Sequence, residues 1–393
     1  MILFEVLIEM LTAIMMVAST LYYALSITSI SRNYRNHVWL NPKINPDLPN
    51  YPRVTVIVPL YHESKEEIIK TLESIAAQRY PHDKLDIVLV VEREDKETLN
   101  NLRSTIDVLN MKKLNYQILI KDTPRSCKAA AINYALSMVD ASDVFVVYDG
   151  GDIIEDEFQI AKAVSLIRNG FDVIGVKVYR VGSSLIGFMS YIDSLLWCNV
   201  MLPALVKLVS NPLFSGEGLF LSAKFINEIN GLPEKLTEDS YLAIYLSKLG
   251  KRGALLDSVI VEAAPINVGS FIKQRIRWFR GYAQCIRDVL LFRSIPLDVK
   301  AKLIVSYLSP YSLISLSLSS LILALSLFLN VPWYLLFASI YVVIGHLIAP
   351  MYLLSLGVRD IRIFLAPFYW FFLGLIAILS IIIPKVKWYK TAR

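Results

Sequence analysis

Val54-Thr55-Val56-Ile57-Val58-Pro59 is a run of apolar and β-branched residues at the start of the central part of the chain. Similar runs recur downstream, each preceded by a stretch with helical spacing. The expected strands are 87–92, 116–120 and 144–149, and the expected helices are 68–78, 96–109 and 128–139. Strands that are apolar throughout are typical of a parallel sheet covered by helices on both faces. The sequence therefore predicts an α/β domain built on a mainly parallel sheet.

Apolar residues are concentrated at the two ends of the chain. Of the 393 residues, 55% are hydrophobic and 19% are charged, and the mean hydropathy is +0.50. This composition indicates membrane-spanning segments. The predicted organisation is a transmembrane anchor (1–31), a linker (32–52), the α/β domain (53–268), an amphipathic interfacial helix (269–293), three transmembrane helices (303–384) and a basic tail (385–393).

Two helices of the central region are expected at the membrane surface. Residues 185–209 are almost wholly apolar, but a span there would place two halves of the α/β domain on opposite sides of the bilayer. In 271–292, apolar residues recur at three- and four-residue steps beside a basic flank. This pattern is typical of an amphipathic helix that lies in the headgroup region.

Arg32 and Arg35 follow the predicted anchor and place the α/β domain in the cytosol, with the chain as a multi-pass protein of the cell membrane. With one anchor and three further spans, the basic tail (385–393) then falls outside, against the positive-inside tendency. Either the tail tolerates that position or one apolar segment is re-entrant. The sequence leaves these two alternatives open.

Charge and cysteine usage exclude several classes of protein. The net charge is +6, but no block of like charges indicates binding to nucleic acid. Cys127, Cys198 and Cys285 are an odd number without metal-type spacing, and the four histidines are scattered. Neither a disulfide framework nor a zinc site is expected.

Acidic residues gather where the predicted strands end. Glu63 follows the first strand, Glu92 and Asp95 follow the second, and Asp149 and Asp152 follow the strand at 144–149. Ligands of open α/β sheets bind at the carboxyl ends of the strands. We therefore expect a binding site at this edge.

Two motifs further along the chain carry the strongest functional signal. Thr237-Glu238-Asp239 precedes an expected helix at 240–249, and Thr237 suits its N-cap. Thirty-five residues after Asp239 stands Gln274-Arg275-Ile276-Arg277-Trp278. A helix would present Gln274, Arg277 and Trp278 on one face, because they lie at i, i+3 and i+4. An amide, a cation and an indole together suit a sugar beside a diphosphate.

With these motifs the chain resembles the membrane-bound family 2 glycosyltransferases, such as cellulose, chitin and hyaluronan synthases and lipid glucosyl- and mannosyltransferases. The resemblance runs from about Val54 to Trp278. It implies a GT-A-like domain that binds a nucleotide sugar, with Asp239 as the base that deprotonates the acceptor. Acidic residues in a first helical turn are common, so this interpretation depends on the pairing with Gln-x-x-Arg-Trp.

The resemblance assigns Tyr61 and Glu63 to the nucleobase. Both lie in Pro-Leu-Tyr-His-Glu (59–63), which matches the family pattern Pro-x-Tyr-Asn-Glu with His62 in place of Asn. The alternative is a plain surface turn after a strand.

Glu92 and Lys128 complete the predicted donor site. Glu92 stands where the family places the first of two base-contacting aspartates, although Asp95 and Glu97 are close, and a solvated acidic turn is the alternative. Lys128 matches a Lys-Ala-x-Ala-x-Asn block, and at the start of a helix it would face a phosphate. The alternative for Lys128 is an exposed lysine.

Asp149-Gly150-Gly151-Asp152 stands in the place of the family's metal motif, which usually reads Asp-Ala-Asp-Asp. The resemblance implies a divalent metal, Mg²⁺ or Mn²⁺, on Asp149 and Asp152. One carboxylate can suffice where phosphates and waters supply the other ligands. The departure at Gly151 leaves three alternatives: replacement by Asp152, a loosely held metal, or loss of activity.

The remaining site residues are assigned to the acceptor and the leaving group. Glu217, Glu238, Gln274 and Trp278 are expected to bind the acceptor, with the indole stacked on a sugar face. Arg277 is expected to bind the nucleotide sugar and to offset charge on the departing diphosphate. A tight turn explains the glycines around Glu217 equally well, and a membrane anchor is the alternative for Trp278.

The predicted function is an inverting glycosyltransferase that moves a hexose or N-acetylhexosamine to a lipid or lipid-linked glycan acceptor at the membrane. UDP-sugars are the family's commonest donors, which is the only ground for preferring uridine. Roughly four spans are few for a polymer channel, so a processive polysaccharide synthase is the alternative enzyme. A homo-oligomer is compatible with either reading. A catalytically inactive membrane scaffold is the alternative outside enzymes.

Overall fold

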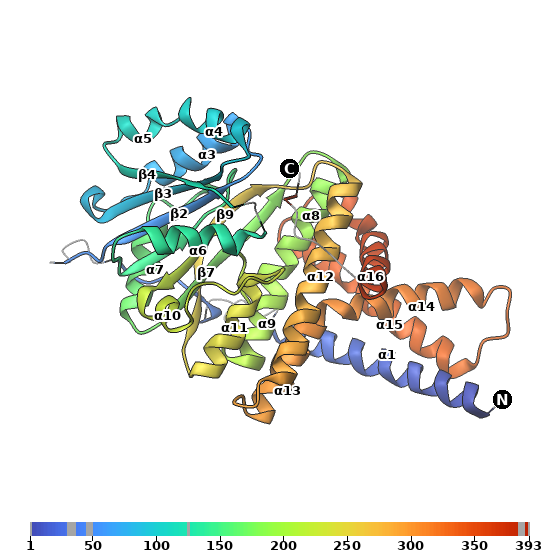
Figure 1. Cartoon of the computed structure of the whole chain (residues 1–393). Coiled ribbons are helices and arrows are strands. Elements are labelled where there is room, and N and C mark those ends of the chain that lie inside the picture. The colour runs from blue at the N-terminus through green and yellow to red at the C-terminus, as the bar shows by residue number, and fades with distance from the viewer. Residues whose placement is uncertain (1, 30–36, 45–49, 124–125, 384–389, 392–393) are drawn as a thin grey trace.

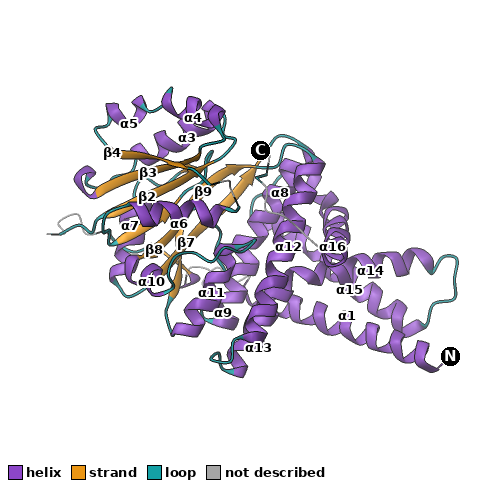
Figure 2. Cartoon of the chain, viewed as in Figure 1, coloured by secondary structure: helices purple, strands orange, loops and turns teal. Residues whose placement is uncertain are grey.

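The computed structural model describes residues 2–29, 37–44, 50–123, 126–383 and 390–391. Parts of the predicted anchor (1, 30–31), linker (32–36, 45–49) and basic tail (385–389, 392–393) lie outside this description. Figures 1 and 2 show an α/β part that contains the sheet and a group of helices beside it. The first helix, α1 (Ile2–Ser29), lies in the helical group.

A nine-stranded mixed sheet forms the centre of the α/β part, with the strand order β1-β9-β7-β8-β5-β2-β3-β4 and with β6 paired to β9. The strands are β1 (Trp39–Leu40), β2 (Val54–Leu60), β3 (Leu85–Glu92), β4 (Asn115–Lys121), β5 (Val144–Val147), β6 (Ile153–Ile154), β7 (Val173–Val181), β8 (Leu219–Ser222) and β9 (Gly253–Ala263). Only β6 and β8 run antiparallel to their neighbours in the described sheet. The prediction of a mainly parallel sheet is confirmed.

Helices cover both faces of the sheet, which explains why its strands are apolar throughout. In β2, Val56 and Val58 pack on one face and Ile57 packs on the other. The first face carries α3 (Lys65–Ala76), α4 (Lys96–Arg103), α5 (Asp107–Met111) and α7 (Gln159–Arg168). The second face carries α6 (Lys128–Met138), α10 (Ala223–Glu228) and α11 (Glu238–Leu249). The single helix predicted at 96–109 is therefore two helices.

The apolar segment Leu185–Val209 is one helical rod packed against the protein. It consists of α8 (Leu185–Leu196), a π turn (Trp197–Met201) and α9 (Leu202–Val209). Within its most apolar stretch, 56% of the residues are buried inside the structure. Its apolar composition is thus explained in large part by packing against its own chain.

Helix α12 (Val268–Leu291) connects the α/β part to the membrane-type helices. Those helices are α13 (Leu297–Leu308), α14 (Leu313–Leu325), α15 (Trp333–Ser355) and α16 (Ala366–Ile382). The span predicted from residue 303 begins at Leu297 and is interrupted by a 3₁₀ turn, Ser309–Ser312, that contains Pro310. Four described segments are long and apolar enough to cross a membrane: Leu185–Val209, Leu297–Leu325, Trp333–Ser355 and Ile361–Ile382.

The membrane-type helices are arranged in two directions. Figure 1 shows α1, α14 and α15 extending together away from the sheet, whereas α16 lies alongside α12. Polar contacts join the first set: Ser19 Oγ lies 3.0 Å from Ser315 Oγ, and the Tyr23 hydroxyl donates to the Val342 carbonyl at 2.6 Å. The apolar stripe of α12, including Ile276 and Phe279, packs in a core shared with α16.

A glycine sets the distance between α12 and the start of α11. A Cβ at Gly281 would lie 2.3 Å from Thr237 Oγ1 and 2.4 Å from Thr237 Cγ2. Thr237 is the N-cap of α11, but its side chain makes no capping hydrogen bond. The methyl and hydroxyl groups of Thr237 therefore pack against the α12 backbone at Gly281, where there is no side chain.

Replacing Gly281 by Ala should lower the unfolding temperature of the detergent-solubilised protein, because overpacking a closed contact costs about 1–3 kcal/mol. The same change in a Thr237→Ala background should cost less, since the two nearest atoms are then absent. Thermal unfolding of the four proteins measures this coupling. An equal decrease in unfolding temperature in both backgrounds would show that Thr237 does not limit the space available to a side chain at position 281.

Candidate functional site

A cavity of about 230 Å³ lies between the carboxyl edge of the sheet and helices α8, α12, α14 and α16. Ten of the twelve predicted site residues line it: Tyr61, Glu63, Lys128, Asp149, Glu217, Glu238, Asp239, Gln274, Arg277 and Trp278. Glu92 and Asp152 are not among the lining residues. The two sequence motifs thus border one space, although they lie on separate helices.

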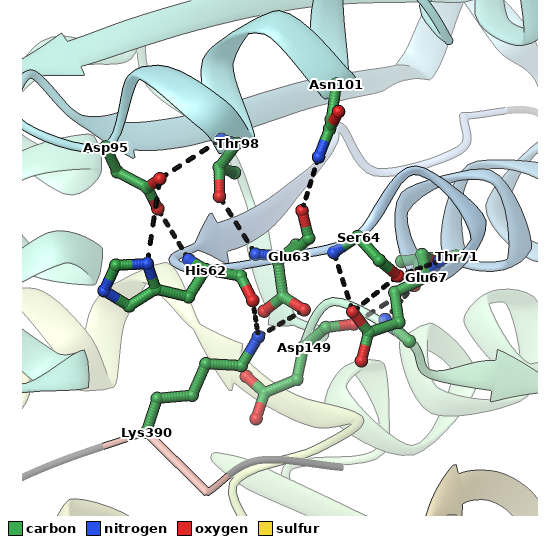
Figure 3. Close-up of polar contacts among 11 residues, drawn as sticks. His62, Glu63, Ser64, Glu67, Thr71, Asp95, Thr98, Asn101, Asp149 and Lys390 are labelled. Carbon is green, nitrogen blue, oxygen red and sulfur yellow. Dashed lines mark hydrogen bonds and ion pairs between the residues drawn. The ribbon is translucent and has the colours of Figure 1, made fainter.

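The loop after β2 is held in place by the start of α4 (Figure 3). The His62 amide donates to Asp95 Oδ2 at 2.5 Å, and the Glu63 amide donates to Thr98 Oγ1 at 2.9 Å. His62 has a φ of 53°, a region that Asn, Asp and His adopt more readily than most residues. This backbone geometry explains why His can replace the family's Asn. It also turns Tyr61 and Glu63 toward the cavity.

The acids after β3 have structural partners. Glu92 is 1% exposed, and its carboxylate lies 3.5 Å from Lys121 Nζ. Asp95 caps α4 and anchors His62, as described above. Because neither residue lines the cavity, this geometry does not support the predicted contact of Glu92 with the nucleobase.

The turn after β5 explains the unusual Asp-Gly-Gly-Asp sequence. A Cβ at Gly150 would lie 2.4 Å from Glu63 Cδ, so the family's usual Ala would collide with Glu63. Gly151 has a φ of +90°, which an aspartate would adopt only with strain. Asp152 is fully buried, and its Oδ2 accepts a hydrogen bond from the Asp149 amide at 2.8 Å.

These positions decide which residue fits a metal ion. Asp152 supports the turn from inside the protein, whereas Asp149 lines the cavity. No three His, Cys, Asp or Glu side chains of the described residues are grouped closely enough to hold a metal by themselves. Asp149 fits a divalent cation that takes its other ligands from phosphate and water. The geometry does not favour Asp152 as a direct ligand.

Lys128 supplies a buried ammonium beside this aspartate. Its Nζ lies 2.6 Å from Asp149 Oδ1 and donates to the Gly216 carbonyl at 2.9 Å. Burial alone would lower the pKa of Lys128, but Asp149, Glu217 and Glu238 outweigh it and raise the pKa above its ordinary value. The side chain is therefore a permanent cation in the cavity.

Glu238 and Asp239 form the first turn of α11 and carry adjacent buried carboxylates. Burial raises the pKa of Glu238, and the charge of Lys128 opposes this shift. Burial and then the neighbouring Glu238 raise the pKa of Asp239 to about 7. A carboxylate with a pKa in this range can take a proton near neutral pH and is suited to general base chemistry.

Helix α12 places Gln274, Arg277 and Trp278 on the cavity side, as predicted. Arg277 donates to the Leu236 carbonyl at 3.0 Å and thereby contacts the segment that leads into Glu238. Gln274 is 2% exposed, and its Oε1 has no hydrogen-bond partner among the described residues. This oxygen can accept a hydrogen bond from a ligand hydroxyl group in the cavity.

Trp278 is engaged by two cations. The guanidinium of Arg180 lies 4.8 Å from its ring centroid, and that of Arg275 lies 4.4 Å away. Arg275 also pairs with Asp193 of α8 at 2.9 Å. The indole is therefore part of a packed cluster, and its stacking on an acceptor sugar stays a prediction.

Sequence reasoning missed several cavity residues. Arg180 lies at the end of β7, so the rule that identified acids at the ends of strands could also have identified this residue. Asp193 is the only acid of the almost wholly apolar segment 185–209, and Tyr282 lies four residues after Trp278 on α12. Lys390 and Thr391 also line the cavity; no local pattern predicts this, because it depends on the path of the distant C-terminus.

The chain matches two known families. Residues 52–281, more than half of the chain, match the family described as "Glycosyltransferase like family 2". Residues 204–383 match a second family, described as "Glycosyl transferase family group 2".

Two curated relatives are similar to the chain. A probable glycosyltransferase, YdaM, of Bacillus subtilis is 23% identical over 272 residues, which are 66% of this chain and 62% of the relative. The cellulose synthase catalytic subunit (UDP-forming) of Pseudomonas fluorescens is 25% identical over 265 residues, which are 64% of this chain and 33% of the relative. The chain thus spans less than two thirds of the length of these relatives.

A solved structure shares the fold over nearly the whole chain. The mannosyltransferase PcManGT of Pyrobaculum calidifontis, solved with GDP-Man and Mn²⁺, has a TM-score of 0.68 and 22% identity, covering 96% of this chain and 97% of its own. The chain belongs to the family 2 glycosyltransferases, and its α/β part has a GT-A-like fold.

Proposed function

We propose that the protein is an inverting glycosyltransferase that moves a hexose or N-acetylhexosamine to a lipid or lipid-linked acceptor in the membrane. One observation carries this proposal. The cavity that contains Asp149 and Asp239 continues to Leu313, Trp370 and Leu373 of the membrane-type helices. A charged donor and an apolar acceptor can therefore meet in one space.

The donor binds at the sheet edge in this proposal. Tyr61 and Glu63 contact the nucleobase, and Lys128 and Arg277 offer cations to the diphosphate. A divalent ion on Asp149, when bound, would offset the negative charge of the diphosphate. The PcManGT structure contains GDP-Man and Mn²⁺, which supports a metal of this kind. UDP-sugars are proposed as donors, because one relative is named UDP-forming.

Asp239 acts as the base in a single displacement. Its carboxylate takes the proton of the acceptor hydroxyl while that oxygen forms the bond to the anomeric carbon of the donor sugar. The bond from this carbon to the diphosphate oxygen breaks, and the electron pair leaves with the nucleoside diphosphate. Attack from the opposite side inverts the configuration. Alignment of the two substrates in a buried cavity supplies much of the rate.

The apolar end of the cavity favours an acceptor with a lipid portion. Leu313 and Leu373 come from α14 and α16, and Trp370 lies beside them. Similarity to a cellulose synthase subunit supports a polysaccharide synthase as the second candidate. We place the protein in the cell membrane with the α/β part in the cytosol, where nucleotide sugars are made.

Replacing Asp239 by Asn should lower nucleoside diphosphate release in the presence of acceptor by roughly 10²- to 10⁴-fold, the usual contribution of a general base. A panel of nucleotide sugars with lipid extract as acceptor provides the assay. Asp257→Asn is a matched control, because Asp257 is exposed and pairs with Lys177.

Two other results would change the interpretation. Release that persists unchanged in Asp239→Asn would remove Asp239 from the mechanism. The absence of release from the wild type with every donor would favour the scaffold.

The rate should depend on pH through Asp239. The base is active when ionised, so kcat/KM should rise with pH up to about 7 and level off above it. Glu238→Gln removes a charge that raises the pKa of Asp239, and should move the midpoint to lower pH. A midpoint that stays in place, or moves to higher pH, would contradict this electrostatic coupling.

The acceptor end can be tested separately from the donor end. Leu373→Gln buries an amide in the apolar part of the cavity and should raise the KM for a lipid acceptor roughly tenfold or more. Slow hydrolysis of the donor by water should be unchanged. Leu379→Gln, on the exposed side of α16, is the control. An unchanged acceptor KM in Leu373→Gln would place the lipid elsewhere.

A further inference from the structure

The C-terminus reaches the donor end of the cavity. Lys390 Nζ lies 2.5 Å from Glu63 Oε2 and donates to the His62 carbonyl at 2.8 Å (Figure 3). Lys390 and Thr391 both line the cavity, together with Tyr61, Glu63 and Asp149. These contacts join the end of the chain to the loop after the first long strand, 328 residues earlier.

We propose that Lys390 and Thr391 complete the donor-binding site, and that the C-terminus therefore lies on the same side of the membrane as the α/β part. This inference rests on the proposed function for the identity of the donor. Lys390 is assigned a positioning role: it neutralises Glu63 and adds a cation near the diphosphate.

The charges of the cavity support this role. Its lining contains six carboxylates, those of Glu63, Asp149, Asp193, Glu217, Glu238 and Asp239, and a donor adds a negatively charged diphosphate. Three of the five lining cations pair with other acids: Lys128 with Asp149, Arg180 with Glu217 and Arg275 with Asp193.

At the nucleobase end, Lys390 pairs with Glu63. Glu63 is 5% exposed. Removal of Lys390 takes a positive charge away from this buried carboxylate close to an anionic ligand, and both burial and repulsion then oppose binding more strongly.

Thr391 provides an independent observation. It is 4% exposed, and its Oγ1 has no hydrogen-bond partner among the described residues. A buried hydroxyl without a partner in a binding cavity is costly unless a ligand or water satisfies it. A hydroxyl or phosphate oxygen of the donor is a suitable partner.

The arrangement of the helices is compatible with this position of the C-terminus. Figure 1 shows α14 and α15 as a pair that runs away from the sheet and back, and α16 lies beside α12. If α14 and α15 cross the bilayer and α16 stays at its surface, two crossings separate the α/β part from the tail. In that arrangement, our proposal selects one of the two alternatives that the sequence left open, with the basic tail on the cytosolic side.

The positioning role is tested with Lys390→Ala and Lys390→Arg in the full-length protein. Lys390→Ala should raise the donor KM, and the Kd of UDP measured without acceptor, roughly 10- to 100-fold, as expected for loss of a charged contact. The value of kcat should change much less. Lys390→Arg should recover most of the affinity, and Lys70→Ala, on the exposed face of α3, should match the wild type. Unchanged binding would overturn the proposal, and so would tighter binding, which would identify Lys390 as a plug that the donor displaces.

The orientation is tested without an activity assay. The three native cysteines are buried, so Arg393→Cys adds a thiol at the end of the chain for a membrane-impermeant maleimide. Labelling should require permeabilised cells, and labelling of intact cells would overturn the proposal. If the wild type releases no nucleoside diphosphate from any donor, the proposed function fails, while labelling still decides the orientation.

Discussion

The contact between α12 and the start of α11 is the constraint on which the site depends. Gly281 brings the α12 backbone against Thr237, and the Leu236 backbone is held from both sides, its carbonyl by Arg277 and its amide by Gln284 at 3.2 Å. Glu238 and Asp239 follow directly, so their position relative to Gln274 is fixed by this contact. Since α12 also packs on α16, the two carboxylates are connected through α12 to the membrane-type helices.

The charges of the cavity depend on one another. Lys128 remains a cation because Asp149, Glu217 and Glu238 surround it, and two of these carboxylates, Glu238 and Glu217, also raise the pKa of Asp239. A buried set of this kind is stable only when its members are paired or hydrogen-bonded. A ligand that brings negative charge changes the balance for every member, which links donor binding to the state of the base.

The sequence predicted the sheet and most of the cavity because both follow from local patterns. Val54–Pro59 is apolar throughout, since both of its faces are covered, and the i, i+3, i+4 spacing places Gln274 and Trp278 on one side of α12. The failures have physical reasons. Strand-end position did not distinguish Glu63, which faces the cavity, from Glu92, which pairs with Lys121. The spacing of Asp152 from Asp149 gave no sign that it points inward, and nothing local connects Lys390 with Glu63.

Helix α1 has its hydrogen-bond partners at the opposite end of the chain. Ser19 contacts Ser315, 296 residues later, and Tyr23 contacts Val342, 319 residues later. For a bilayer-embedded α1, these hydroxyls have no water to bond with until α14 and α15 are inserted. Helix α14 also supplies one wall of the cavity. Biogenesis is therefore ordered in time: α1 gains these partners, and the cavity gains its α14 wall, only after the ribosome has made the chain as far as Val342.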